Sequence, residues 1–476
     1  MQRSITNRDS RGGLTSALMA LVCLASAPLA VFAQNSQSSA SATAAMEDEF
    51  QAAMAAQDKG DLDGAESLLR DLHVHHPGIF QVDESLGLLI ASRGNAVAAL
   101  PLLESAVREQ PASDVAHANL GAAYYQLHRA KPALEEFERA VEINPGNASA
   151  QESLGRISIE NQMPEQAARA LLAAQKLRPD DADLKLDCIA ALLAANRLAD
   201  AQDMLSKVAD ADQSARAQSL WGEADERAGK FQSAGEHFAR AVALEPSEEN
   251  AWQMALELLR HWTFDAAIIE FKAASIKFPQ SKRLKLGLGA ALFGDAKYAD
   301  AVPLFADLLA AEPGNAMYAE LLGIACNAPL PDNNPRCNAL VDYAQSHPKD
   351  AHAATYAAGF LLTGNENQQN VKLARELVER AIKADSQMPD AQFEMAVILQ
   401  QNSDFKESIP YLERAVKLKP DFSRAHYRLA RAYWRVGRDQ DGQTQMDLTQ
   451  KYSRQEQDDL NRRLGQIVTL GVEVKQ

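Results

Sequence analysis

The sequence is poor in aromatic residues and cysteines, and it lacks the short motifs that carry catalysis or phosphate binding. Aromatic residues make up 6% of the 476 residues, and there are four cysteines. We find no Gly-rich phosphate loop, no G-K-[ST], no G-x-S-x-G, no H-E-x-x-H and no C-x-x-C. The common nucleotide-binding, hydrolase, zinc-protease and dithiol redox sites are therefore excluded. We expect a protein that is not an enzyme and that holds no cofactor or metal.

Positive charge and long apolar runs are also scarce. The chain has 48 Lys and Arg against 64 Asp and Glu, which gives a net charge of −16 at pH 7. Such an acidic protein does not attract nucleic acid or anionic membranes by charge. Beyond residue 33 no apolar run approaches the length that spans a bilayer. We therefore expect no nucleic-acid partner and no integral membrane segment in the rest of the chain.

The first 33 residues differ in composition from the remainder. Three arginines precede an apolar stretch, which ends in Val-Phe-Ala at residue 33. This pattern predicts a secretory signal peptide over 1–33, followed by a flexible polar linker over 34–45. An uncleaved membrane anchor and lipid attachment at Cys23 are the alternatives. The signal peptide predicts export to the periplasm or to the outside of the cell.

A period of 34 residues runs through most of the chain. The clearest unit extends from Asp114 to Asn147, and its apolar spacing predicts two amphipathic helices, Asp114–Leu127 and Pro132–Ile143, joined by a turn at His128–Lys131. A proline follows the second helix of most units, at Pro77, Pro111, Pro145, Pro179, Pro246, Pro279, Pro313, Pro348 and Pro420. One such hairpin cannot bury its apolar face alone, so the repetition indicates a stacked array.

Within each unit, large and small residues recur at fixed places. In the clearest unit the first helix carries Leu120, Gly121 and Tyr124 on its inner face, and the second carries Phe137 between two alanines. The Leu-Gly pair has counterparts at Leu86-Gly87, Leu154-Gly155, Trp221-Gly222, Leu288-Gly289 and Leu322-Gly323. We expect the small residues to allow close approach of the helices and the large ones to fill the space between them.

These residues make the chain resemble the tetratricopeptide repeat (TPR) family. The resemblance implies an all-α fold, a right-handed superhelical solenoid of about twelve antiparallel helix-turn-helix repeats over 46–452. A capping helix and tail are expected over 453–476. The family also implies a concave groove, lined mainly by first helices, that binds a partner protein or peptide. The predicted function is a non-enzymatic exported scaffold, with roles in envelope assembly or secretion. A structural spacer or self-assembling array is the first alternative, and an enzyme on a repeat scaffold is the least favoured. Because an open solenoid end can pair with another chain, a homo-oligomer is a further expectation.

The last repeat carries the candidate binding residues. Its first helix contains Arg424, Arg428, Arg431 and Arg435, spaced by four, three and four, so they share one helix face. Tyr427 and Trp434 flank this face. Arginine side chains can fork onto a carboxylate and stack on apolar groups. The resemblance suggests a clamp for an acidic or C-terminal peptide, whereas the alternative is a solvated face paired with acidic residues of the tail.

Cysteine, histidine and tryptophan give four further expectations. Cys326 and Cys337 flank a proline-rich turn in an expected exported protein, so a disulfide is predicted, with two unpaired thiols as the alternative. Cys188 occupies a leucine position and is predicted to be a core residue. The cluster His73, His75 and His76 lacks companion ligands and is predicted to be a surface feature, whereas Trp252 is predicted either to contact a ligand or to pack in the core.

Overall fold

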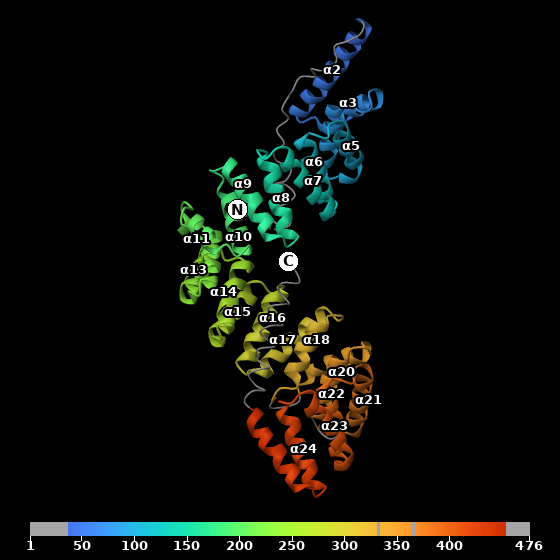
Figure 1. The fold of residues 1–476 in the computed structure, drawn as a ribbon, viewed down its shortest axis with the longest axis vertical. Helices are drawn as coiled ribbons and strands as arrows, with labels where there is room; N and C mark the ends of the chain where they lie inside the picture. The colour runs from blue at the N-terminus through green and yellow to red at the C-terminus, as the bar shows by residue number, and fades with distance from the viewer. Residues whose placement is uncertain (1–36, 331–333, 364–366, 454–476) are drawn as a thin grey trace, which may run out of the picture. The chain divides into compact units, whose positions relative to one another are not determined.

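The computed structural model describes residues 37–330, 334–363 and 367–453, and the side chains from residue 44 onward. Over these residues the chain is all α-helical, apart from two short 3-10 turns, and has no strand (Figure 1). The predicted signal peptide and all but the first residue of the predicted capping helix lie outside them. The chain divides into two compact units, residues 1–233 and 234–476, within the helix α13.

The N-terminal unit consists of helices that follow one another in antiparallel pairs. Neighbouring helices in the chain pack together, as α4 does with α5 and α6 with α7 (Figure 1). Its helices are α2 (Gln37–Asp58), α3 (Leu62–His75), α4 (Phe80–Ser92), α5 (Ala96–Glu109), α6 (Asp114–Gln126), α7 (Ala130–Ile143), α8 (Ala148–Glu160), α9 (Pro164–Leu177), α10 (Ala182–Ala194), α11 (Leu198–Leu205), the 3-10 turn Ala211–Gln213 and α12 (Ala215–Arg227).

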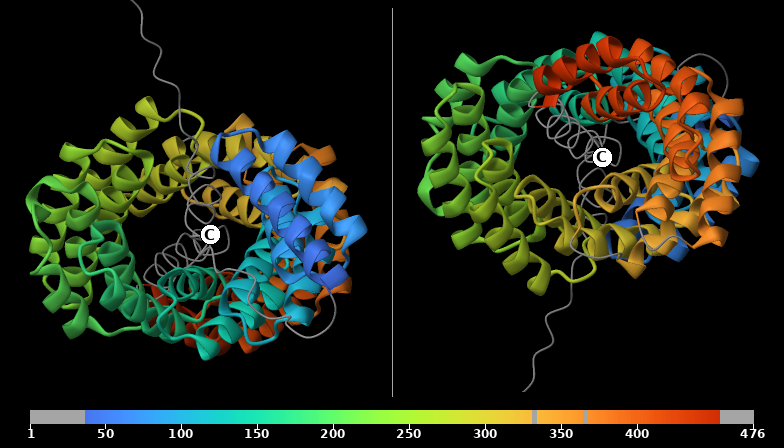
Figure 2. Two further views of the ribbon diagram at one scale, coloured as in Figure 1. Left: turned by 90° about the horizontal axis from the view of Figure 1, so that it is seen from above. Right: turned by 90° about the horizontal axis from the view of Figure 1, so that it is seen from below.

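The C-terminal unit continues the same pattern, and Figure 2 shows its helices in two further views. Its helices are α13 (Phe231–Leu244), α14 (Glu248–Arg260), α15 (Phe264–Lys277), α16 (Lys282–Gly294), α17 (Tyr298–Ala311), α18 (Ala316–Cys326), the 3-10 turn Pro335–Cys337, α19 (Asn338–Ser346), α20 (Ala351–Leu362), α21 (Gln368–Ala384), α22 (Pro389–Gln401), α23 (Phe405–Leu418), α24 (Ser423–Arg435) and a helix over 439–453. The prediction of an all-α solenoid of helix pairs is confirmed.

The predicted boundaries agree closely with the structure, with two differences. In the clearest repeat, α7 begins at Ala130, so Pro132 lies within the first helical turn, where its missing N–H breaks no helical hydrogen bond. At the N-terminal side, α2 already begins at Gln37, so the predicted linker over 34–45 is helical from residue 37 onward. This segment is rich in alanine, which has the highest helix propensity.

The ends of the helices explain how one repeat leads into the next. A side chain two residues after the terminal proline caps the following first helix, as Ser113 Oγ does by accepting from the Ala116 N–H at 3.1 Å. The same cap recurs at Asn147, Asp181, Ser281, Asn315 and Asp350. Each such cap stabilises its helix by about 1 kcal/mol. The terminal proline therefore stops one helix just before a capping residue starts the next.

The turn inside each repeat also has a fixed geometry. The second residue after the first helix adopts a left-handed backbone, at glycines in some repeats and at non-glycine residues in others, namely His128, Gln162, Asn196, Trp262, Ala296 and Ser403. At His128 the next N–H, that of Arg129, donates to Tyr124 O at 2.9 Å, which satisfies a carbonyl at the helix end. This turn makes the two helices of each repeat antiparallel.

Small residues set the distance between paired helices, as predicted. Ala133, Phe137 and Ala140 of α7 are buried, and so is Leu120 of α6. A Cβ atom on Gly121 would lie 3.1 Å from the Phe137 ring, so glycine at this place lets the ring contact the α6 backbone. The core is a ribbon of such contacts along each unit, as expected for a solenoid.

Candidate functional site

The helix α24 presents the arginine face predicted from the sequence. Ala425, Leu429 and Ala432 are buried and fix the helix against its neighbours, which leaves the opposite face accessible. Arg424 and Arg431 are exposed on that face, and Arg428 between them is half-buried. Three positive charges therefore lie along one side of α24 within a strongly acidic protein.

These arginines line a pocket of about 470 Å³ in the C-terminal unit, hereafter the arginine pocket. Its wall comes from the end of α18, from α20, α22 and α24, and from the helix over 439–453. The lining residues are Asn327, Gly359, Leu362, Thr363, Phe393, Glu394, Val397, Ser423, Arg424, Tyr427, Arg428, Arg431 and Thr449. The pocket thus combines basic, aromatic and aliphatic groups from the first helices of consecutive repeats.

The helix α22 supplies an aromatic wall for the arginines. The guanidinium carbons of Arg424 and Arg428 lie 5.5 and 5.7 Å from the centre of the Phe393 ring. Arg431 lies 5.8 Å from the ring of Tyr427, one turn earlier on α24. Contacts of a guanidinium with a ring face are worth about 0.5–1 kcal/mol at exposed sites and hold the side chain in place. The rings therefore orient the three positive charges.

Arg428 is joined to Gln400 of α22 by two hydrogen bonds. Its Nη1 donates to Gln400 Oε1 at 3.2 Å, and its carbonyl accepts from Gln400 Nε2 at 3.2 Å. Burial lowers the pKa of Arg428, and the nearby Glu394 carboxylate opposes this by favouring the charged form. An arginine remains protonated under all ordinary conditions. Arg428 is therefore a fixed positive charge in a partly desolvated position.

Glu394 is the acidic residue of the pocket. It is half-buried on α22, and burial raises its pKa to about 7, against the attraction of Arg424 and Arg428, with a further increase from Asp390. Its Oε1 lies 3.2 Å from the place where a Cβ on Gly359 would be. The absence of a side chain at Gly359 thus leaves space for this carboxylate.

The side of the pocket formed by α18 and α20 is held by an asparagine. Asn327 Nδ2 donates to Gly323 O at 2.8 Å and to Tyr356 O at 2.9 Å, which ties the end of α18 to α20. A Cβ on Gly359 would overlap the Asn327 amide oxygen. The position of the Asn327 side chain in this wall therefore requires glycine at residue 359.

Two of the predicted site residues lie outside the arginine pocket. Arg435 has its guanidinium carbon 5.4 Å from the ring of Phe405 on α23. Trp434 packs so closely on Gly442 that a Cβ there would overlap the indole. The structure thus brings Arg424, Tyr427, Arg428 and Arg431 together in the pocket and directs Trp434 and Arg435 to other surroundings.

Sequence reasoning missed Phe393 and Glu394, although the period contains a signal for them. They lie 34 residues before Tyr427 and Arg428, at the same positions of the preceding repeat. In a solenoid, equivalent positions of consecutive first helices are neighbours along the groove. Subtracting one period from Tyr427 and from Arg428 would therefore have pointed to Phe393 and Glu394.

The remaining aromatic and histidine candidates have structural surroundings. Trp252 is buried and its ring centre lies 5.6 Å from that of Phe271, so it is a core residue. His73 Nδ1 lies 2.6 Å from Asp83 Oδ1, and His75 Nδ1 lies 2.7 Å from the carbonyl of Asp71. These two histidines therefore face different partners.

The cysteines behave in two ways. Cys188 is fully buried, as predicted for a core residue, and burial raises the pKa of its thiol to about 12. Cys326 and Cys337 lie with their Cα atoms 5.9 Å apart and with their sulfur atoms in disulfide geometry. The pair joins the end of α18 to the start of α19. Its oxidation in the mature protein stays a prediction.

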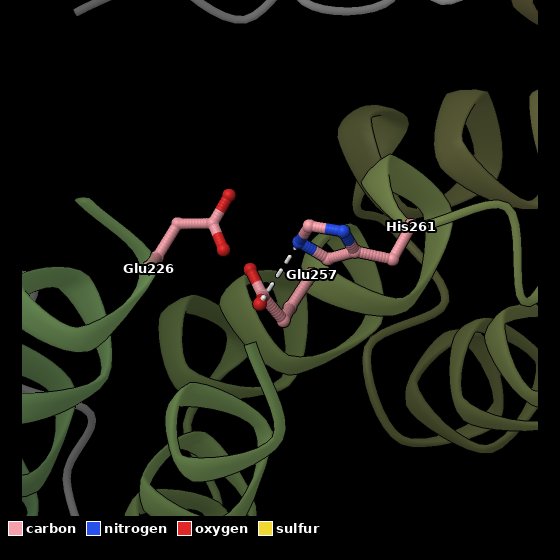
Figure 3. Close-up of side chains that lie close together, drawn as sticks. All are labelled: Glu226, Glu257 and His261. Carbon is pink, nitrogen blue, oxygen red and sulfur yellow. Dashed lines mark ion pairs between the residues drawn. The ribbon is translucent and has the colours of Figure 1, made fainter. Parts of the chain in front are cut away.

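Figure 3 shows Glu257 in the last turn of α14 and His261, the residue that follows this helix. His261 Nε2 lies 3.3 Å from Glu257 Oε1, and Glu257 is buried. Glu226, drawn in the same figure, belongs to the N-terminal unit. One histidine and one carboxylate provide fewer ligands than a metal centre takes. The pair ties the last turn of α14 to the residue after it.

Comparison with models of known families bears out the repeats predicted from the sequence. Two tetratricopeptide repeat models match the chain, one at residues 91–157 and the other at 50–114, 253–316 and 393–442. The last of these matches covers the Phe393, Glu394 and α24 part of the pocket. The chain contains tetratricopeptide repeats in these stretches, as its repeated residues predicted. The comparison with curated proteins finds no match.

Several solved structures are similar to this chain. YrrB, a TPR protein with an unusual peptide-binding site, is 18% identical with a TM-score of 0.36, and the match covers 38% of this chain and 94% of YrrB. PilF of Pseudomonas aeruginosa is 17% identical with a TM-score of 0.36, and the match covers 44% of this chain and 95% of PilF. A chain of Naa15/Naa10 bound to HypK-THB is 15% identical with a TM-score of 0.36, and the match covers 85% of this chain and 68% of that one.

No described helix is both long enough and apolar enough to cross a membrane.

Proposed function

We propose that the protein is a non-enzymatic scaffold that binds a partner protein through an acidic peptide segment in the arginine pocket. The observation that carries this proposal is the convergence of Arg424, Arg428 and Arg431 on one pocket of a chain whose net charge is −16. A carboxylate is the group that guanidinium forks bind best. An aliphatic or aromatic side chain next to it would lie against Leu362, Val397 and Phe393.

We further propose that the scaffold is exported and acts in envelope assembly or secretion. Two features of the chain support export, the signal-like composition of residues 1–33 and the disulfide geometry of Cys326 and Cys337. Disulfides persist in oxidising compartments such as the bacterial periplasm. Fractionation of cells that express the full chain, together with the N-terminal sequence of the mature protein, tests this part. A cytosolic protein that retains residues 1–33 would refute it.

Peptide binding is tested with fluorescence anisotropy and a labelled probe, fluorescein-Gly-Asp-Glu-Asp-Leu with a free C-terminus. A C-terminally amidated copy distinguishes a terminal carboxylate from side-chain carboxylates, and Gly-Lys-Arg-Lys-Leu reverses the charge. We expect the acidic probe to bind, with an affinity that falls as salt screens the charges. We expect the basic probe not to bind.

The matched variants change exposed arginines so that folding is preserved. The double variant Arg424→Gln, Arg431→Gln removes two positive charges from the pocket, whereas Arg414→Gln removes an exposed charge from the neighbouring helix α23. Each charge-assisted hydrogen bond is worth about 1.5–3 kcal/mol, so the double variant should weaken binding at least tenfold. Arg414→Gln should bind as the parent does. Equal binding by all three, or no binding of the acidic probe, would refute the pocket and favour a structural spacer.

A further inference from the structure

The arginine pocket contains a negative charge that a site for anions does not need. Among its lining residues Glu394 is the acidic one, and it lies at the position of α22 that corresponds to Arg428 one repeat later. It is half-buried, so its charge is only partly screened by water. A ligand carboxylate in the pocket would meet the same arginines that Glu394 already attracts.

The charged groups around Glu394 come from two helices. On its own helix α22, Asp390 repels the ionised carboxylate; from α24, Arg424 and Arg428 attract it. Arg431 and Tyr427 of α24 also line the pocket. Towards α20 and the end of α18, the carboxylate meets Gly359 and the neutral Asn327. None of the described lining residues from α18 or α20 is titratable.

We propose that Glu394 competes with the bound peptide for Arg424 and Arg428, so that an acidic peptide binds together with a proton that Glu394 takes up. This inference rests on the proposed function, because it concerns the same pocket. In this proposal Glu394 determines which ligand charge the pocket accepts, and it makes binding depend on pH. The proton goes from solvent to a Glu394 carboxylate oxygen, and no covalent bond to the ligand forms.

The direction of the effect follows from the electrostatics. Burial holds the pKa of Glu394 at about 7, so the carboxylate is mostly neutral at pH 6 and mostly charged at pH 8. A carboxylate of the ligand disfavours the charged form of Glu394 and raises that pKa further. The complex therefore holds more protons than the free protein, and affinity increases as the pH falls. For one group of this pKa, the increase from pH 8 to pH 6 is about tenfold.

The experiment measures binding of the labelled Gly-Asp-Glu-Asp-Leu probe to the full chain at pH 6, 7 and 8. The carboxylates of this probe have ordinary pKa values near 4, so they stay ionised throughout. Three proteins are compared, the parent, Glu394→Gln and the matched control Glu407→Gln, an exposed glutamate in the first turn of α23. Calorimetry in buffers of different ionisation enthalpy counts the protons taken up, with roughly half a proton per peptide expected at pH 7 for the parent.

The expected result is an approximately tenfold increase in affinity from pH 8 to pH 6 for the parent and for Glu407→Gln. Glu394→Gln should show no such increase and should bind at pH 8 about as tightly as the parent binds at pH 6. Circular dichroism checks that the variant is folded. A pH-independent parent, or a Glu394→Gln variant that keeps the dependence, overturns the inference and leaves the proposed function intact. No probe binding by the folded parent at any pH overturns both.

Discussion

The packing of glycine at the Leu-Gly position gives a prediction that joins the sequence motif to stability. Gly289 lies in α16, and a Cβ there would be 2.5 Å from Cε1 of Phe305 and 2.9 Å from its Cζ. Phe305 is fully buried on α17, so its ring has no free space to move into. We predict that Gly289→Ala forces α16 and α17 apart.

The magnitude results from two opposing effects. Alanine favours the helix by about 1 kcal/mol over glycine. Overpacking a filled core costs about 1–3 kcal/mol, and a Cβ 2.5 Å from an atom of the buried Phe305 ring puts this substitution at the upper end, about 2–3 kcal/mol. We therefore expect a net loss of about 1–2 kcal/mol. Gly235→Ala in α13 is the matched control, because no atom lies within 4 Å of a Cβ at Gly235. It should gain up to about 1 kcal/mol.

The assay is hydrogen exchange followed by mass spectrometry, because a solenoid of this length is not expected to unfold in one step. Exchange reports the local free energy of opening for each helix. In Gly289→Ala, peptides from α16 and α17 should exchange about five to thirty times faster than in the parent. Peptides from α22 and α24 should be unchanged. Unchanged or slower exchange of α16 and α17 would refute the packing argument.

Three other predictions concern the backbone and the cysteines. Ala296 has a left-handed backbone with φ 56°, and this conformation costs about 1–2 kcal/mol for a residue with a Cβ. Glycine avoids that cost but loses about 0.4–1 kcal/mol more in chain entropy on folding. Ala296→Gly should therefore slow the hydrogen exchange of α16 and α17 by up to about tenfold, and faster exchange would contradict this. In the exported protein, Cys326 and Cys337 should resist alkylation even in denaturant, and they should react only after the disulfide is reduced. Reduction should destabilise the α18–α19 turn by about 3 kcal/mol. Cys188 should react only after unfolding, because burial raises its thiol pKa to about 12; reaction of Cys188 in the native protein would contradict its core position.

The repeat, the helices and the arginine face of α24 could all be predicted without a structure. Apolar spacing, terminal prolines and capping residues act within one helix or across one turn, so they can be recognised in about 34 neighbouring residues. For the same reason the sequence placed Arg424, Arg428 and Arg431 on one face. Cys188 was also assigned correctly to the core, because its position in the repeat is that of a buried leucine.

The neighbours of these residues depend on how the repeats pack, which the sequence did not reveal. It placed Glu394 and Phe393 of α22 against the arginines of α24, turned Trp434 and Arg435 to other neighbours, and buried Trp252 beside Phe271. The period predicts which residues are equivalent, but the contacts also depend on how each helix packs on the next and on which side chains fill the space. The elevated pKa of Glu394 arises from that packing, because burial between helices is a property of the assembled repeats and not of any one of them.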